Sequence, residues 1–462
     1  MGLGARESVV EAARFLTSPC QRLAPRGREH FHSLSGRRAG DRSVQRFPSV
    51  HHLGRVDRPT VFACPAPAEP PASPFAPNQI ARGRPVRYLY SMRILFASGR
   101  EYLPHRVDGA IMSIHALFRQ LLHRGHHCEV CAGIDGRKRV RTAVYRVRRL
   151  LTGRRTPGWA DRRNGYPTYR LWETLIPDLI RKRIAEQRPD LVITQLELSE
   201  EIAAAATELG VPTILYVFDA EFNWRKTLAL DSPHLLLISC SRFLATRVSE
   251  LLRLETPVVY PIVEPDRYRV QRRRDRYVTM VNPVPKKGID IAVEVARLLP
   301  HRRFLLVETW PLSPDYRREL GGRLARLPNV KLVGSTSDMR SVYGETAVLL
   351  APSQWEEAFG RVILEAQVSG IPVVSSRRGG IPELLEGGGT LLTATDPPET
   401  WAAAVEAILA DPAYHSAMSA AARANAERAD FDAGAIADRF LEIAAAHIAR
   451  AGGGASPAFS RT

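Results

Sequence analysis

The chain has 462 residues, which is too many for one compact core, so we expect at least two domains. With 45% hydrophobic and 24% charged residues, the composition is that of a soluble globular protein and excludes a chain that is disordered or fibrous throughout. No apolar run reaches the roughly 18 residues of a membrane-spanning helix. The five cysteines are too few for a disulfide framework and fit a reducing compartment, so we expect a cytoplasmic protein.

The net charge of +17 is unevenly distributed along the chain. Residues 1–91 hold 14 Arg, no Lys and 6 acidic residues, and a second basic segment covers residues 136–163. Such a segment can attract anionic lipid, nucleic acid or a charged substrate. For residues 136–163 we favour a solvated basic loop, and we leave open a peripheral contact with the inner face of a membrane. We expect no nucleic-acid partner.

Residues 1–91 differ in character from the rest of the chain. They contain proline clusters such as "CPAPAEPPASPFAP" and no sustained apolar period, which predicts disorder. The arginine content is typical of a transit peptide, but the early acidic residues Glu7 and Glu11 argue against one. Met92 opens "MRILFAS", which has the pattern of a first buried strand, and we interpret Met92 as the natural start.

A first domain is predicted over residues 92–265, where strand and helix patterns alternate. The strands are "RILFAS", "CEVCAG", "LVITQ", "VPTILYVFD" and "HLLLISCS". The helices are "IMSIHALFRQLLHRGH", "WETLIPDLIRKRIAEQRPD", which Pro177 interrupts, and "ELSEEIAAAATELG". Strands separated by helices of this length imply a parallel sheet.

Cys128 and Cys131 form a CxxC pair inside the second predicted strand. Positions three apart on a strand point to opposite faces, and no second pair or nearby His-x-x-x-His completes a zinc set. We therefore favour buried structural cysteines over a metal or redox pair.

A second domain is predicted over residues 266–435 because the alternation repeats. Its strands are "RYVTMVNP", "RFLLVE", "VKLVG", "AVLLAPS" and "IPVVSS", and "GIDIAVEVARLLP" is its first helix. The Ala-rich end of the chain is predicted helical, with residues 436–462 forming a C-terminal helix and tail. The fold class is α/β, with two doubly wound Rossmann-like domains facing across a cleft. Ligands in such sheets bind beyond the carboxyl ends of the strands.

Two carboxylates, Glu357 and Glu365, flank the entry of a predicted helix in "SQWEEAFGRVILEAQVSG". The N–H groups and partial positive charge of a helix N-terminus suit a phosphate, and Gly360 allows close backbone approach. An acid beside a phosphate site is explained if it accepts hydrogen bonds from sugar hydroxyls. From spacing alone, an ordinary helix start, with Glu356 and Glu357 complementing the dipole, stays equally open.

The longer stretch "PSQWEEAFGRVILEAQVSGIPVVSSRRGGIPELL" resembles the E-x7-E region of retaining nucleotide-sugar glycosyltransferases of family four, also called glycosyl transferases group 1. These enzymes have the GT-B fold, and the resemblance covers about residues 92–450. It implies that Glu365 holds the ribose hydroxyls of the donor and that Glu357 contacts the transferred sugar. It also implies that the backbone of Phe359, Gly360, Arg361 and Val362 meets the diphosphate.

The lysine of "KKGID" matches the family's Lys-Gly turn, so Lys287 is expected to stabilise the departing diphosphate. Where the family has an arginine five residues earlier, this chain has Asn282, which we place among the donor-binding residues. The charge that is missing there would come from Lys286 or Arg361, and the sequence leaves that choice open.

The remaining features of the family are only partly present. Gly109, next to Asp108, matches half of the glycine loop that faces the diphosphate. Gly334 and Ser335 follow a strand where the family seats the base. Phe218 occupies the place of a family histidine, so that role does not transfer to this chain.

We therefore interpret the chain as a retaining hexosyltransferase acting on a UDP-, GDP- or ADP-sugar without a metal cofactor. The acceptor is a sugar, a lipid-linked molecule or a small molecule, and a role in cell envelope polysaccharide is expected. The alternatives are a nucleotide-sugar epimerase of the same fold and a basic protein that binds nucleic acid or membranes.

Overall fold

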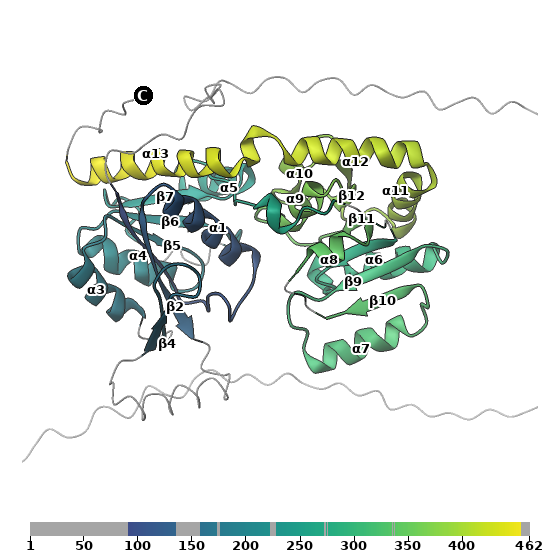
Figure 1. Ribbon diagram of the computed structural model, residues 1–462, viewed down its shortest axis with the longest axis horizontal. Coiled ribbons are helices and arrows are strands. Elements are labelled where there is room, and N and C mark those ends of the chain that lie inside the picture. Colours follow the sequence, from purple (N-terminus) through teal and green to yellow (C-terminus); the bar gives the residue numbers. More distant parts are fainter. Residues whose placement is uncertain are drawn as a thin grey trace, which may run out of the picture. The chain divides into compact units, whose positions relative to one another are not determined.

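A computed structural model describes residues 91–134, 158–172, 176–221, 228–271, 274, 276–334, 336 and 338–453. Residues 1–90, most of the basic segment 136–163, and Ser335 lie outside this part, as do the predictions made for them. The described residues form two parallel-sheet domains followed by C-terminal helices, which confirms the predicted fold class (Figure 1). In the described part, no helix is both long and apolar enough to cross a membrane.

The first domain is built on a seven-stranded sheet with the order β3-β4-β2-β1-β5-β6-β7. All neighbouring strands are parallel except β3 and β4, which run antiparallel. The strands are β1 (Arg93–Ser98), β2 (His127–Ile134), β3 (Gly158–Asp161), β4 (Thr168–Trp172), β5 (Leu191–Thr194), β6 (Thr213–Val217) and β7 (Leu235–Ser239). The helices are α1 (Gly109–His123), α3 (Ile176–Gln187), α4 (Ser199–Glu208) and α5 (Arg242–Leu252).

Alternation along the strands divides the apolar side chains of this sheet between its two faces. Ile94 and Phe96 of β1 belong to the core under α1, whereas Leu95 and Ala97 belong to the core under α3 and α4. Cys128 and Cys131 divide in the same way, and both are buried free thiols whose pKa burial raises. This confirms the expectation that the two cysteines of the CxxC pair are buried on opposite faces of the sheet.

The expectation for Pro177 is wrong. Trp172 ends strand β4, and α3 begins at Ile176, so Pro177 lies in the first turn of the helix instead of interrupting it. A proline is tolerated there because first-turn N–H groups have no partner within the helix. Strands β3 and β4 were not predicted, because β3 lies at the end of the basic segment, β4 lies shortly after it, and neither contains a continuous apolar run.

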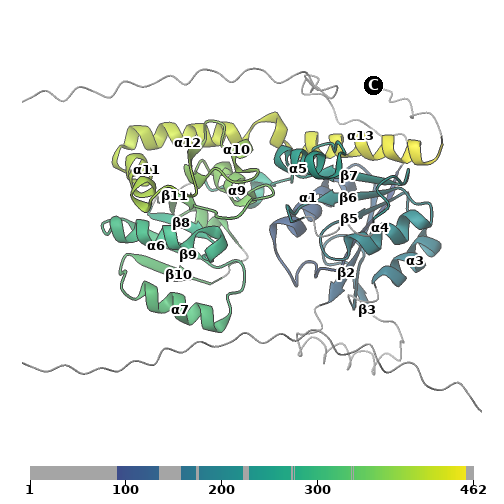
Figure 2. The same cartoon turned by 180° about the vertical axis from the view of Figure 1, so that it is seen from behind.

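The second domain has a six-stranded, fully parallel sheet with the order β10-β9-β8-β11-β12-β13. Strands β8, β9, β10 and β11 of this sheet are labelled in Figure 2. Its strands are β8 (Tyr277–Val281), β9 (Arg303–Val307), β10 (Val330–Val333), β11 (Thr346–Ala351), β12 (Val373–Ser376) and β13 (Gly389–Leu392), of which β13 was not predicted. Its helices are α6 (Ile289–Leu298), α7 (Pro314–Leu324), α8 (Arg340–Tyr343), α9 (Arg361–Val368), α10 (Ile381–Leu384), α11 (Pro398–Ala410) and α12 (Pro412–Ala426). Short 3-10 turns are η2 (Pro265–Arg267), η3 (Pro285–Lys287) and η4 (Ala429–Phe431).

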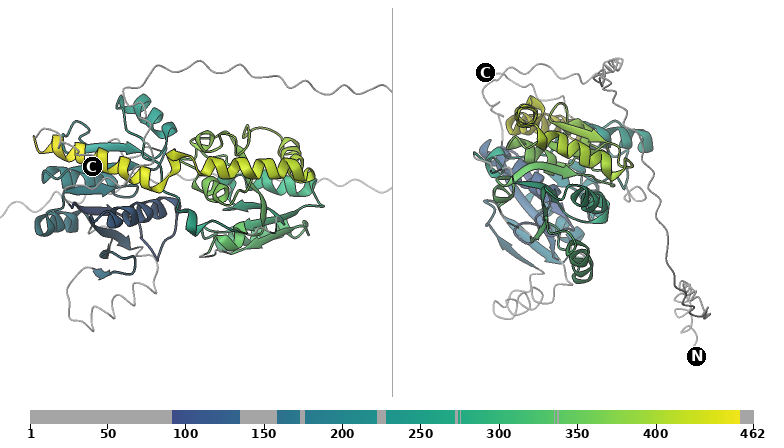
Figure 3. Two further views of the ribbon diagram at one scale, coloured as in Figure 1. Left: turned by 45° about the horizontal axis from the view of Figure 1, so that its top comes forward. Right: turned by 90° about the vertical axis from the view of Figure 1, so that its right-hand side faces the viewer.

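The last helix, α13 (Ala433–Ala451), returns from the second domain and packs on α1 of the first (Figure 3). Phe440, Leu441 and Ala444 are buried in the same core as Leu121 of α1. Arg124, which caps α1, donates from Nε to Asp438 Oδ1 at 2.8 Å and from Nη2 to the carbonyl of Gly434 at 3.0 Å. The chain therefore passes between the domains twice, once near η2 and once near η4.

Candidate active site

Two loops at the carboxyl edge of the second sheet interlock and carry the predicted catalytic side chains. The first follows β8 and contains Lys286 and Lys287, and the second follows β11 and contains Glu357. The carbonyl of Lys286 accepts from the N–H groups of Gln354 at 3.0 Å and Trp355 at 3.1 Å. Gly288 has φ of +82°, and a Cβ there would lie 1.9 Å from the Pro352 carbonyl oxygen. Only glycine allows this approach of the two loops.

The ammonium of Lys287 forms an ion pair with Glu357, its predicted partner in catalysis. Ser353, a buried residue, donates from Oγ to the same carboxylate oxygen, Glu357 Oε1, at 2.8 Å. The side chains of Lys287 and Glu357 are 18% and 16% exposed, so both reach solvent from a partly enclosed position. The structure therefore brings the two predicted catalytic residues into direct contact and orients the acid through a hydroxyl group.

The start of α9 leaves several backbone donors without an acceptor. Gly360 precedes the helix with φ of +90°, and a Cβ there would press on Ile381 and Leu384 of α10 at 3.3 Å. Among the described residues, no acceptor is found for the N–H groups of Phe359, Gly360, Arg361 and Val362. Such groups carry partial positive charge, so this helix start has the donors that the predicted diphosphate site requires, and binding there stays a prediction.

Glu365 lies one turn into α9 and is held by two partners. Its Oε1 accepts from Arg361 Nε at 2.8 Å, and its Oε2 accepts from the Tyr343 hydroxyl at 3.1 Å. Burial, together with the Glu365 charge, raises the pKa of Tyr343, so that tyrosine stays a donor. The carboxylate is 12% exposed and has lone pairs left for hydroxyl groups.

The side chain of Arg361 bonds to other parts of the protein as well as to its own helix. Beyond Glu365, its Nη1 donates to the Ile262 carbonyl at 2.6 Å and to Ser113 Oγ at 3.2 Å, and its Nη2 donates to the Tyr268 hydroxyl at 3.3 Å. Burial works against its charge, but Tyr268 and Glu365 raise the pKa of Arg361 above its ordinary value. Its side chain thus joins α9 to α1 and to the segment between the domains.

Gly109 begins α1 close to this arginine. A Cβ at Gly109 would lie 3.5 Å from Arg361 Cδ, so the first turns of α1 and α9 lie side by side. The N–H groups of Gly109 and Ala110 have no acceptor among the described residues. Two helix starts with open donors therefore meet at the position that the sequence assigns to the diphosphate.

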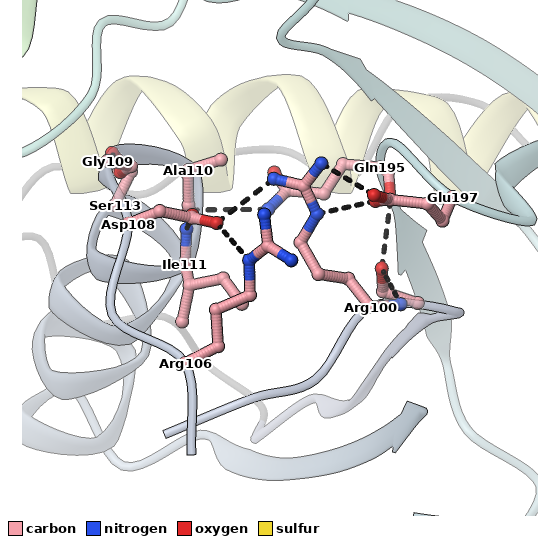
Figure 4. A network of polar contacts seen from close by, with 10 residues as sticks. Arg100, Arg106, Asp108, Gly109, Ala110, Ile111, Ser113, Gln195 and Glu197 are labelled. Carbon is pink, nitrogen blue, oxygen red and sulfur yellow. Dashed lines mark hydrogen bonds and ion pairs between the residues drawn. The ribbon is translucent and has the colours of Figure 1, made fainter. Parts of the chain in front are cut away.

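Asp108, in the place of the family's first loop glycine, is the centre of a charged network (Figure 4). Its Oδ1 caps α1 by accepting from the Ile111 N–H at 3.0 Å, and its Oδ2 accepts from Arg100 Nη1 at 3.0 Å and Arg106 Nε at 2.7 Å. Arg100 also pairs with Glu197, which follows β5. The two acids and two arginines balance in charge, so the carboxylate is neutralised locally.

Replacing Asp108 by Ala should lower the free energy of unfolding by about 1–2 kcal/mol, because the helix loses its N-cap and the arginines lose a partner. Asn at this position also caps helices and should retain most of that stability. Urea denaturation of both variants measures the difference. Arg106→Ala is the control, since its side chain is 45% exposed and exposed ion pairs contribute little. Equal losses for Ala and Asn would show that the cap is unimportant.

Several predicted residues are not brought into contact with this site. Asn282 has φ of +61°, and its Oδ1 accepts from Thr309 N, Thr309 Oγ1 and Trp310 N, so it binds the loop after β9 to the end of β8. Gly334 follows the edge strand β10, and Ser335 lies outside the described residues. Phe218 packs edge-on against Tyr216. The donor-binding roles of Asn282, Gly334 and Ser335 stay predictions.

Three residues near the site were not predicted from the sequence. Ser353 orients Glu357, Tyr343 orients Glu365, and Trp310 lies 5.0 Å from the Lys287 ammonium, measured to the ring centre. Ser353 has a sequence signal, because it follows a strand four residues before an acid. Tyr343 and Trp310 have none, since their contacts depend on how separate loops pack.

Comparison with known proteins places residues 276–411 in the family model described as Glycosyl transferases group 1. The D-inositol 3-phosphate glycosyltransferase of Mycolicibacterium paratuberculosis is 31% identical over 196 residues, which cover 38% of this chain and 44% of that protein. The enzyme of the same name from Segniliparus rotundus is 33% identical over 159 residues, covering 32% of this chain and 35% of that protein. The matches therefore span less than half the length of these relatives.

Solved structures extend the likeness to most of the chain. HepE from Anabaena, in complex with UDP-glucose, has a TM-score of 0.61 at 20% identity and covers 76% of this chain and 99% of its own. Sucrose-phosphate synthase from Thermosynechococcus elongatus has a TM-score of 0.60 at 18% identity and covers 76% of this chain and 98% of its own. At these identities the likeness concerns the fold. Residues 276–411 of the second domain thus match the family model of the glycosyl transferases group 1, and the chain as a whole has the GT-B fold.

Proposed function

We propose that the protein transfers a hexose from a nucleoside diphosphate sugar to an acceptor hydroxyl. The observation that carries the proposal is the Lys287–Glu357 pair beside the open N-terminus of α9. A cation and unpaired N–H groups suit a diphosphate, and a carboxylate suits the hydroxyls of a sugar. The complex of the similar protein HepE with UDP-glucose supports a UDP-sugar donor.

In this proposal each residue acts on one part of the donor. Glu365 accepts hydrogen bonds from the ribose hydroxyls, and Tyr343 keeps the carboxylate oriented. The backbone N–H groups from Phe359 to Val362 bind the diphosphate. Lys287 offsets the negative charge that grows on the diphosphate as the sugar departs, which makes it the main electrostatic catalyst.

We propose retention of the anomeric configuration through a front-face reaction. The bond between the sugar C1 and the β-phosphate oxygen breaks, and the acceptor oxygen forms a new bond to C1 from the same side. The acceptor proton passes to the departing phosphate oxygen, so no protein base is required. Glu357 positions the sugar hydroxyls during this exchange. In this proposal the acceptor enters from the first domain, and the product belongs to cell envelope polysaccharide.

The experiment that tests this function is a thermal-shift panel with UDP, GDP, ADP and their glucose conjugates, followed by an acceptor screen with the conjugate that stabilises most. Stabilisation by one nucleoside diphosphate and transfer of its sugar to an acceptor are expected. Conversion of the donor to its epimer in the absence of an acceptor would instead establish an epimerase. No shift with any of the six compounds would contradict both readings.

Replacing Glu365 by Gln should weaken nucleoside diphosphate binding by about 10- to 100-fold, because hydrogen bonds to a charged acceptor are the strong ones. Gln retains one oxygen for Arg361, whereas Ala would leave that arginine unpaired and confuse binding with stability. Isothermal titration calorimetry measures the affinity. As a control, Glu356→Gln removes a neighbouring acid that pairs with Arg378 instead of Arg361. Wild-type affinity in Glu365→Gln would refute the ribose assignment.

A further inference from the structure

The diphosphate needs more positive charge than Lys287 supplies. A nucleoside diphosphate leaves with about three negative charges at neutral pH, while Lys287 is already paired with Glu357. The net charge of that pair is zero, so it attracts an anion weakly until the contact opens. The open N–H groups of α9 contribute only a fraction of a charge. A second cation close to Lys287 is therefore required.

The other candidates near the site are already committed. All three nitrogens of the Arg361 guanidinium donate to protein acceptors, and the group is buried. Arg378 pairs with Glu356 at 3.0 Å. Asn282 is uncharged, and its side-chain oxygen is occupied by three donors. Arg361 cannot turn to a diphosphate without leaving buried partners unsatisfied, and Arg378 would have to give up its acidic partner.

Lys286 differs from all of them because its ammonium has no ion pair within the described part of the chain. The ammonium lies between two indole rings, 5.0 Å from the centre of Trp310 and 4.9 Å from the centre of Trp355. Trp310 is shared with Lys287, whose ammonium is also 5.0 Å from the ring centre. Both lysines therefore lie against one indole ring.

The two indole rings orient Lys286 without neutralising it. A cation is attracted to an aromatic face, but the ring carries no formal negative charge, so the ammonium keeps its net positive charge. The backbone of Lys286 is fixed as well, since its carbonyl accepts from Gln354 N and Trp355 N. The result is a pre-positioned cation with free donors, which is the requirement for binding a phosphate at low entropic cost.

We propose that Lys286, held between Trp310 and Trp355, is the second cation that binds the diphosphate of the donor. This inference rests on the proposed function and extends it to a residue that the matched motif does not assign. Lys286 supplies the positive charge that the uncharged Asn282 cannot provide. Lys287 then exchanges Glu357 for the departing phosphate, while Lys286 holds the diphosphate throughout.

The test compares the binding of UDP, UMP and uridine to wild type, Lys286→Gln and Lys286→Arg by calorimetry. GDP and ADP with their monophosphates and nucleosides replace this series if wild type prefers them. Lys286→Gln should bind UDP about 10- to 100-fold more weakly, with less than about a threefold change for uridine. Lys286→Arg should retain most of the UDP affinity. Lys331→Gln is the matched control, because it removes an exposed lysine from β10 of the same domain.

Three outcomes distinguish the inference about Lys286 from the proposed function. Weaker UDP binding in Lys286→Gln, with uridine unaffected and the charge restored by Arg, supports the inference. Unchanged UDP affinity in Lys286→Gln, or an equal loss for uridine, overturns the inference and leaves the proposed function standing. If wild type binds none of the three nucleoside diphosphates, the proposed function falls and the inference falls with it. Thermal unfolding of each variant verifies that the exposed substitutions preserve the fold.

Discussion

Replacing Lys287 by Ala should lower kcat by about 100- to 1,000-fold, which is the usual loss when one preorganised group that stabilises a developing negative charge is removed. The reason is specific to this site. The ammonium lies at the end of a turn that Gly288 holds close to the Pro352 carbonyl, so the loop fixes where this cation is placed. A coupled assay for nucleoside diphosphate release under saturating donor measures the rate.

The ion pair with Glu357 predicts a second effect of the Lys287→Ala substitution. Removing Lys287 leaves an unpaired carboxylate beside the diphosphate, and part of the loss is repulsion by that acid. Glu357→Gln in the Lys287→Ala background should therefore recover some nucleotide affinity, although the double variant stays slow. A double-mutant cycle on UDP affinity measures this coupling. Strict additivity, or a Lys287→Ala enzyme with wild-type kcat, would exclude the assigned role.

Replacing Arg361 by Leu should lower the free energy of unfolding by about 3–5 kcal/mol, which makes it the most destabilising of the single changes considered. The substitution leaves Glu365 buried without its cation and removes donors from the Ile262 carbonyl and the Tyr268 hydroxyl. Lysine retains the charge but cannot bridge these partners, so Arg361→Lys should recover only part of the stability. Urea denaturation followed by circular dichroism measures both variants.

Arg378→Leu is the matched comparison for this effect. Its partner Glu356 and its own side chain are 45% and 36% exposed, so the pair is screened by solvent and its loss should cost less than about 1 kcal/mol. A similar loss for the two arginines would mean that the contacts of Arg361 do not stabilise the fold. The same result would remove the argument that Arg361 is unavailable to the diphosphate.

The sequence is sufficient to predict both sheets because their central strands are continuous apolar runs. "RILFAS" and "AVLLAPS" are buried on both faces and correspond to β1 and β11. Strand β4, "TYRLW", has no such signal, because Arg170 is buried in it and is neutralised by Asp161 and by the carbonyls of Tyr102 and Leu103. A buried charge with partners distant in sequence cannot be recognised from local pattern.

The candidate site follows the same rule. The E-x7-E spacing places Glu357 and Glu365 on either side of a helix start, and the structure has that arrangement. The sequence could not decide whether Arg361 or Lys286 supplies the second positive charge for the diphosphate, because both are cations close to the two loops of the site. Only packing shows that Arg361 meets Ser113 and Ile262, while Lys286 meets two indole rings.

The return of α13 to the first domain has a mechanical consequence. A single linker would let two domains swivel about any axis, but here two chain crossings, near Pro265 and near Phe431, join them. Two crossings give the chain two places at which it can hinge, and they restrict the relative rotation of the domains more than one crossing would. The anchoring of α13 by Arg124 to Asp438 and Gly434 keeps the second hinge in place. The C-terminal helix thereby limits the direction in which the domains can open and close.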